Sequence, residues 1–266
     1  MTTQILRPTL LAVSLSLGLP ATPVLAEAPS LTIAMGSGMP NVVPDPRARM
    51  NGWFGNRSGI SETLLGLDYE MRLVPRLAET WENSAPDTWV LTLREGVRFH
   101  NGAPLTSEDV AWSWRRYLTP QTRWRCLTEF DGRGTTKLTG IETPDARTVV
   151  FQFERASALI PAMMARPDCG ASAALHRDSV GADGAWIAPI GTGPFRMGDW
   201  RRGQYIELQR FDGYVARSEP RDGYTGNKTP EVERVRFMII PDQAAAKAAL
   251  LSGAIDVLTD IANSDL

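Results

Sequence analysis

Few residues of this sequence have the types and spacing that catalysis or metal binding requires. The sequence has two histidines, His100 and His176, and neither has a second metal ligand at helical spacing. No G-x-S-x-G nucleophile turn occurs, because the string GNRSG at residues 55–59 places Ser58 one position late. Acidic residues are plentiful, but the sequence alone places no pair of them in one cleft. We therefore expect no enzyme activity, no bound metal and no cofactor.

The N-terminal residues predict that the chain is exported. Residues 9–19 (TLLAVSLSLGL) are apolar, but the run is shorter than the roughly 20 residues that cross a bilayer. Arg7 precedes this run, Pro20 ends it, and the residues up to Ala26 suit cleavage. We expect a signal peptide over residues 1–26, with a buried N-terminal helix as the alternative. The mature chain should be soluble, with no segment inserted in the membrane.

The two cysteines are then expected to form a disulfide. Cys126 and Cys169 are the only cysteines of the sequence, and in an oxidising compartment such a pair more often bridges than stays free. The loop that they would close corresponds to about 4 kcal/mol in the chain-entropy description. Two buried free thiols are the alternative.

Composition and charge exclude several classes of protein. The chain has 266 residues, of which 43% are hydrophobic and 22% charged, and a formal net charge of −2. This composition is typical of a folded globular protein of one or two domains. The near balance of charge argues against a strongly basic nucleic-acid partner.

Sequence periodicity predicts a mixed α/β fold. Alternating apolar residues predict three hairpins, over residues 77–93, 137–153 and 195–210. Helices are expected over residues 58–65, after the N-cap Thr106, over 157–165, and over 243–251 between Asp242 and Gly253. Strands are expected over residues 31–35, 235–240 and 255–258. The last two strands and the helix between them predict a β-α-β crossover with a parallel pair.

Six segments of the sequence together carry a family resemblance. They are LVPRLAETW at 73–81, LREGVRFHNG at 93–102, PLTSEDV at 104–110, GTGPF at 191–195, IPD at 240–242 and LLSGAID at 250–256. In this order and spacing they resemble the dipeptide, oligopeptide and nickel class of periplasmic solute-binding proteins that serve ABC-type importers. Most of these motif residues have a structural interpretation: we expect Gly96, Gly102, Gly191 and Gly193 in tight turns.

The resemblance implies an architecture and a missing part. It implies a two-lobed, periplasmic binding protein-like fold that closes around a solute. The first lobe would have its core in residues 27–66 and 185–254, with an additional β-rich subdomain over residues 67–184. Residues 255–266 would begin the crossover to a second lobe, which this chain largely lacks. Because a single lobe cannot form a cleft between two lobes, we expect no tight solute capture by the chain alone.

The resemblance also implies which residues contact a solute. First-lobe contacts come from loops after strands, and the loop from Met35 to Met39 follows the first strand. Trp53 and Phe54 lie in a loop rich in Gly and Asn, where they either face the cleft or pack locally. Trp124 and Arg166 correspond to segments that hold a chelate's carboxylates in the nickel-binding branch. An arginine suits this role because its guanidinium pairs bidentately with a carboxylate; a surface ion pair is the alternative for Arg166.

Three functions are consistent with the sequence. The first is the substrate-binding component of an ABC-type importer, capturing a peptide or similar small polar solute in the periplasm and delivering it to the permease subunits in the membrane. This component is expected to be a monomer. The second is a shortened, non-transporting interaction module, and the third, which the sequence favours least, is an exported α/β hydrolase.

Overall fold

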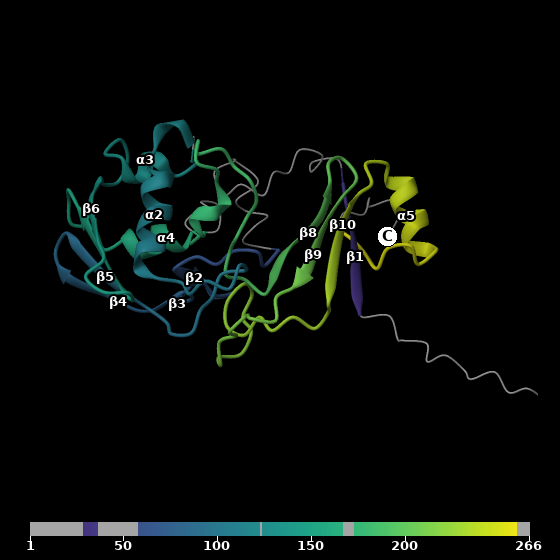
Figure 1. Ribbon diagram of the computed structural model, residues 1–266, viewed down its shortest axis with the longest axis horizontal. Helices are drawn as coiled ribbons and strands as arrows, with labels where there is room; N and C mark the ends of the chain where they lie inside the picture. Colours follow the sequence, from purple (N-terminus) through teal and green to yellow (C-terminus); the bar gives the residue numbers. More distant parts are fainter. Residues whose placement is uncertain (1–28, 37–57, 123, 167–172, 260–266) are drawn as a thin grey trace, which may run out of the picture.

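Two β-sheets lie at opposite ends of the long axis of the molecule (Figure 1). The structure is a computed structural model that describes residues 29–36, 58–122, 124–166 and 173–259. One sheet has the strand order β11-β1-β10-β9-β8, and the other has the order β4-β5-β7-β6. A separate antiparallel pair consists of β2 (Leu65–Leu67) and β3 (Leu73–Pro75).

The four-stranded sheet consists of the first two predicted hairpins. Its strands are β4 (Ala78–Ala85), β5 (Thr88–Leu93), β6 (Leu138–Glu142) and β7 (Thr148–Phe153). All pairings are antiparallel, and β5 lies between β4 and β7. The alternation in the sequence places Leu91 and Leu93 with Val149 and Phe151 in the larger hydrophobic core. Both hairpin predictions are therefore confirmed.

Helix α2 (Ser107–Tyr117) covers this sheet and begins where the sequence indicates. The backbone N–H and the hydroxyl of Thr106 both donate to the Asp109 carboxylate, over 3.0 and 2.7 Å. Trp114 and Tyr117 then enter the core. Shorter helices follow on the same side of the molecule: η1 (Pro120–Thr122), α3 (Leu127–Phe130), α4 (Ile160–Ala165) and η2 (Arg177–Ser179). Helix α4 is shorter than the predicted 157–165. It begins at Ile160, because Pro161 has no N–H to donate within a helix and is therefore favoured in its first turn.

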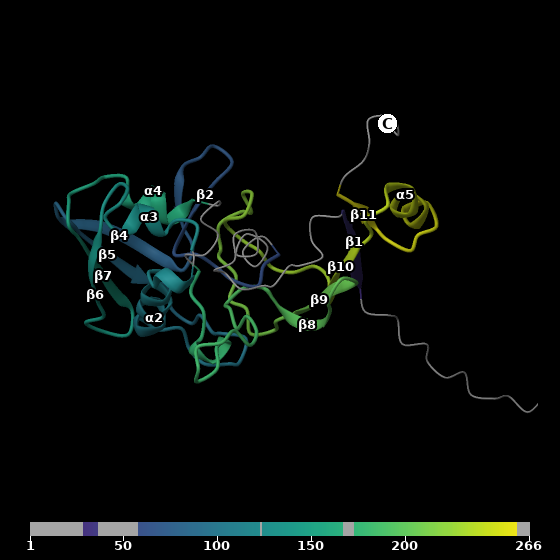
Figure 2. The same ribbon diagram turned by 90° about the horizontal axis from the view of Figure 1, so that it is seen from above.

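The five-stranded sheet contains the third hairpin and the predicted crossover. Its strands are β1 (Ser30–Met35), β8 (Phe195–Arg201), β9 (Tyr205–Arg210), β10 (Arg234–Ile239) and β11 (Val257–Leu258). Strands β10 and β11 are parallel as predicted, but they are not neighbours, because β1 pairs with both and lies between them. Helix α5 (Gln243–Leu251) makes the crossover and lies beside β11 (Figure 2).

The ends of α5 agree with the sequence prediction. The Asp242 carboxylate accepts the N–H of Ala245 over 2.7 Å, and Gly253 has a φ of +74°. Across the described ranges, no helix is both long enough and apolar enough to span a membrane.

The predicted helix over residues 58–65 is wrong, because this segment begins with a turn and continues as an irregular stretch, with one isolated bridge at Thr63, into β2. Its carbonyl groups bond to neighbouring segments instead of to a helix: Ile60 O accepts Gly193 N, and Glu62 O accepts Ala174 N. Gly193 is required for this approach, since a Cβ there would lie 2.1 Å from Gly59 O. Gly191 and Gly193 therefore serve close backbone packing rather than the expected tight turns, and a helical apolar spacing was overridden by tertiary contacts.

Candidate functional site

The residues that the sequence singled out lie in separate parts of the fold. Met35 ends β1, is half-buried, and packs on the smaller hydrophobic core of the five-stranded sheet. Helices α3 and α4 lie at the other end of the molecule in both views (Figures 1 and 2). Met39, Trp53, Phe54 and Cys169 lie outside the described residues. Met35 is therefore not brought together with the helices that precede or contact Arg166.

Trp124 and Arg166 belong to neighbouring segments. The Trp124 ring is 3% exposed and stacks on Phe130 of α3 at 5.6 Å between ring centres. Arg166 follows α4, and its Nη1 lies 3.4 Å from Glu129 Oε1, also in α3. The structure thus joins the two segments through α3. The Arg166 side chain is 37% exposed, whereas the Trp124 ring lies in the core.

A buried charge cluster lies between the two sheets. Glu62 at its centre is 2% exposed. Its Oε1 lies 3.1 Å from Lys228 Nζ and accepts from the Tyr214 hydroxyl at 3.3 Å. Its Oε2 accepts from the Thr192 hydroxyl at 3.2 Å and lies 3.6 Å from Arg94 Nη2. We call these five residues, together with Arg76, the Glu62 cluster.

The members of the Glu62 cluster join distant parts of the chain. Arg76 and Arg94 flank β4 and β5 of the four-stranded sheet, whereas Tyr214 and Lys228 lie in the connection from β9 to β10. Further contacts reinforce this joint, since Arg94 Nη1 donates to Val215 O over 2.7 Å and Arg217 Nη1 donates to Arg76 O over 3.0 Å. The cluster therefore holds the two sheets together.

The charges of the cluster depend on one another. Burial alone would raise the pKa of Glu62, but Lys228, Arg76 and Arg94 outweigh it and hold this pKa below its ordinary value. Burial and the neighbouring Arg76 lower the pKa of Lys228 to about 8, against the attraction of Glu62. Burial also raises the pKa of Tyr214, so this phenol stays protonated and donates to Glu62. Removing the Glu62 carboxylate would leave the buried cations Lys228, Arg76 and Arg94 without their negative partner.

His100 clamps the segment that leads into β8. Its Nδ1 lies 3.3 Å from Gly191 N, which donates to it, and its Nε2 lies 3.1 Å from Gly193 O. These contacts define a neutral ring with the proton on Nε2. The ring packs edge-on against Phe211 at 5.1 Å. Burial lowers the pKa of His100 to about 4, so the imidazole is neutral in the folded protein near neutral pH.

The stability of the protein should therefore fall in acid through His100. The unfolded pKa of histidine is about 6.5. Since the folded pKa is lower, the contribution of His100 is complete above pH 6.5 and is lost as the pH falls towards about 4. The expected loss between pH 7 and 4.5 is about 2–3 kcal/mol. Urea unfolding at a series of pH values measures it. His100→Gln should flatten this part of the profile; an unchanged acid slope in His100→Gln would contradict the assignment.

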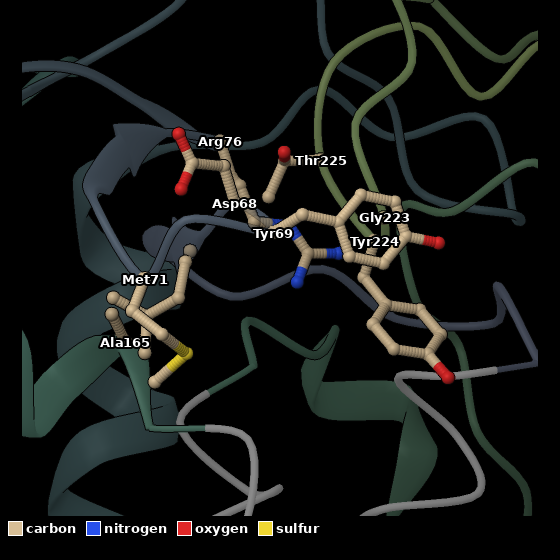
Figure 3. A pocket seen from close by; sticks show the side chains of 10 residues that line it. Asp68, Tyr69, Met71, Arg76, Ala165, Gly223, Tyr224 and Thr225 are labelled. Atoms are coloured by element: carbon tan, nitrogen blue, oxygen red, sulfur yellow. The ribbon is translucent and has the colours of Figure 1, made fainter.

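A cavity of about 210 Å³ opens beside the Glu62 cluster. Arg76 of the cluster lines it, together with Leu67, Tyr69, Tyr224 and, from the end of α4, Ala165 (Figure 3). The cavity thus lies next to the segment that carries Arg166. Sequence reasoning did not find this cavity or the cluster. The one signal available in the sequence was that Arg76, Arg94 and Thr192 lie in segments that carry the family resemblance.

The cavity and the adjoining Glu62 cluster are chemically suited to holding an anion or a polar solute. Their cations are arginines and a lysine, and the nearby aromatic side chains offer apolar surface. In the described part of the chain, no group of three or more His, Cys, Asp or Glu side chains could hold a metal ion.

Comparisons with known proteins agree with the resemblance in the sequence. The sequence model of the family described as "Bacterial extracellular solute-binding proteins, family 5 Middle" matches residues 72–266. A probable peptide ABC transporter periplasmic-binding protein of Sinorhizobium fredii is 29% identical over 205 residues, which are 75% of this chain and 37% of that protein. The nickel-binding periplasmic protein of Escherichia coli is 28% identical over 207 residues, 76% of this chain and 36% of that protein.

The fold agrees with solved structures of the same kind. The crystal structure described as a nickel ABC transporter from Bacillus halodurans has a TM-score of 0.66 and 25% identity, over 86% of this chain and 42% of that chain. This chain therefore spans less than half the length of the relatives that it matches. The predicted class, a mixed α/β fold like the first lobe of a periplasmic binding protein, is confirmed.

Proposed function

This chain belongs to the family 5 bacterial extracellular solute-binding proteins, and on that premise we propose that it supplies the first lobe of a substrate-binding component of an ABC-type importer. It would capture a peptide or similar small polar solute and present it to the permease subunits. Relatives are named as peptide-binding and nickel-binding periplasmic proteins. The observation that carries the proposal is the match of both sequence and fold across most of the chain.

Two separate parts of the lobe would contact solute, and because they lie at opposite ends of the molecule, a short solute would occupy one of them at a time. One is the carboxyl end of β1 at Met35, continued by Met39, Trp53 and Phe54 beyond it. The other is Arg166, whose guanidinium is partly exposed at the end of α4. Trp124 would act indirectly, because its ring packs against Phe130 and so supports α3 and its contact with Arg166. Binding and release by closure of lobes needs no covalent step.

The same premise supports a periplasmic location. A signal peptide over residues 1–26 would direct export, and the oxidising compartment would allow a Cys126–Cys169 bridge. Cys126 is buried at the start of α3, and the described residues include no free cysteine. The bridge would tie α3 to the segment that follows Arg166.

The proposal predicts a specific loss of affinity in one variant. A tripeptide should bind the 266-residue chain with a dissociation constant in the millimolar range, about 1 mM or weaker, because one lobe offers only part of a cleft. Arg166→Met should weaken this binding about tenfold, since it removes a charged partner of the peptide carboxylate. A titration followed by tryptophan fluorescence measures both constants.

The matched control is Glu129→Gln, which removes the ion-pair partner of Arg166 but keeps the guanidinium. It should bind the tripeptide at least as well as the unchanged chain. Equal affinities of Arg166→Met and the unchanged chain would show that Arg166 is only a surface ion pair. Turnover of a peptide or ester by the chain would favour the hydrolase instead.

A further inference from the structure

Two opposed turns form the rim of the cavity beside the Glu62 cluster. Residues 68–72 form one turn, in which Asp68 Oδ1 accepts the N–H groups of Glu70 and Arg72 over 3.0 and 2.8 Å. Residues 222–225 form the other, closed by Asp222 and Thr225 bonding to each other. Tyr69 N donates to Asp222 Oδ1 over 2.8 Å and so joins the two turns. The rim is therefore held by its own hydrogen bonds.

Large apolar side chains stand exposed on this rim. Tyr69 is 83% exposed, Met71 68% and Tyr224 46%. Met71 also has a φ of +62°, a conformation that a residue with a side chain adopts at a cost. Exposed aromatic residues around an apolar hollow are typical of a binding site rather than of an ordinary surface.

The base of the cavity carries a buried positive charge. Arg76 is 4% exposed, and Figure 3 shows its guanidinium directed into the space between Met71 and the two tyrosines. Its neighbours Arg94 and Lys228 are also cations, and all three act on the single Glu62 carboxylate. Asp68, which lines the wall, is already engaged by Arg72 at 2.7 Å. The field at the base therefore favours an anion.

We propose that this cavity is a second binding site, separate from the solute contacts proposed above, for a small aromatic carboxylate. The ring of the ligand would lie against Tyr69 and Tyr224, and its carboxylate would approach the Arg76 guanidinium. The volume of about 210 Å³ admits a single-ring ligand, since pockets for drug-sized molecules measure about 300–1,000 Å³. The aromatic carboxylate is either a free acid or the C-terminal residue of a peptide.

A titration with phenylacetate tests this site. Amide signals of residues 68–72 and 222–225 in the nitrogen-15 NMR spectrum of the 266-residue chain should shift saturably as phenylacetate is added. Phenylacetamide has the same shape without the charge and should bind at least tenfold more weakly, because a charge-assisted hydrogen bond is lost. The peptide Gly-Gly-Phe distinguishes the two sources, with its C-terminal amide as the uncharged control. If Gly-Gly-Phe binds more tightly than phenylacetate, the site is for peptide C-termini. If Gly-Gly-Phe binds more weakly, the site is for free acids.

Variants of the rim keep this test independent of the fold. Tyr69→Ala removes an exposed ring and should weaken phenylacetate binding threefold or more, roughly the value of one aromatic contact. Ile187 is also an exposed apolar residue but does not line the cavity, so Ile187→Ala should leave binding unchanged. Arg76→Lys should also weaken binding. Because Arg76 belongs to the buried Glu62 cluster, this substitution should also lower the stability of the fold, so the Tyr69 variant is the primary test.

Three results would overturn the proposal. The first is the absence of shifts at both turns up to about 20 mM phenylacetate, since a dissociation constant above that value would mean no specific binding. The second is equal affinity for phenylacetate and phenylacetamide. The third is an affinity of Tyr69→Ala for phenylacetate equal to that of the unchanged chain. None of them would affect the proposed function, since that function depends on Arg166 and the end of β1.

Discussion

Replacing Glu62 with glutamine is expected to lower the free energy of unfolding by about 3–5 kcal/mol, because it removes the negative partner of a buried charge cluster. Glutamine keeps an oxygen that can accept from Thr192 or Tyr214, so the loss reports charge rather than shape. Lys228 and the two arginines would remain buried without the carboxylate. Urea unfolding of Glu62→Gln at pH 7, compared with the unchanged chain, measures the effect.

A matched carboxylate on the surface provides the control. Glu95 pairs with Arg147, but its side chain is 78% exposed, so Glu95→Gln should have little effect. Adding Lys228→Met to Glu62→Gln should recover part of the loss, because it removes one of the uncompensated cations. If Glu62→Gln is as stable as Glu95→Gln, the cluster does not join the two sheets in the way described.

Replacing Trp114 with alanine is expected to cost about 3–5 kcal/mol, the range for truncating a fully buried aromatic side chain. Trp114 is 1% exposed, and its ring lies edge-on to Trp124, Phe130 and Phe151 at 5.8, 5.2 and 5.3 Å. The lost contacts involve α2, α3 and β7 together. Thermal unfolding of Trp114→Ala should show a large fall in melting temperature, with α3 and the Arg166 segment destabilised as well.

Trp114→Phe shows how much of the stability depends on an aromatic ring at this position and how much on the full size of the indole. Phenylalanine keeps one aromatic ring in the core and should recover more than half of the loss. A surface truncation, Ile187→Ala, should change the stability by less than about 0.5 kcal/mol. A Trp114→Ala variant that unfolds at the temperature of the unchanged chain would show that this aromatic group is not the centre of the larger core.

The local elements of the fold were predictable from the sequence, but part of their arrangement was not. Alternation in Thr88–Leu93 and Thr148–Phe153, and the cap at Thr106, depend on residues close together in the chain, and these predictions are confirmed. The non-helical path of residues 58–65 depends on Gly193 and Ala174, which lie far along the chain, and a local spacing rule cannot detect them. The insertion of β1 between β10 and β11 is likewise a non-local pairing.

The candidate site was predictable only in outline. The family resemblance directed attention to Arg166 and Met35, and the structure places both at the ends of secondary-structure elements. Arg76 lies in the LVPRLAETW segment, but nothing in the sequence links it to Glu62 or Lys228, because the partners of a buried charge become known only when the chain is folded. For the same reason the two turns around the cavity, at residues 68–72 and 222–225, could not be paired from the sequence.

The position of a bound peptide on the lobe tests the central claim most directly. Amide shifts of the nitrogen-15 labelled chain should be mapped while a tripeptide is added to several millimolar, about the expected dissociation constant. The account predicts that the shifts gather at Glu129 of α3 and Arg166 after α4, or at Met35 and Gly36 after β1. Shifts confined to the outer strands β4 and β6, or no shift at any of these four residues, would contradict the assignment of this chain as a solute-contacting first lobe.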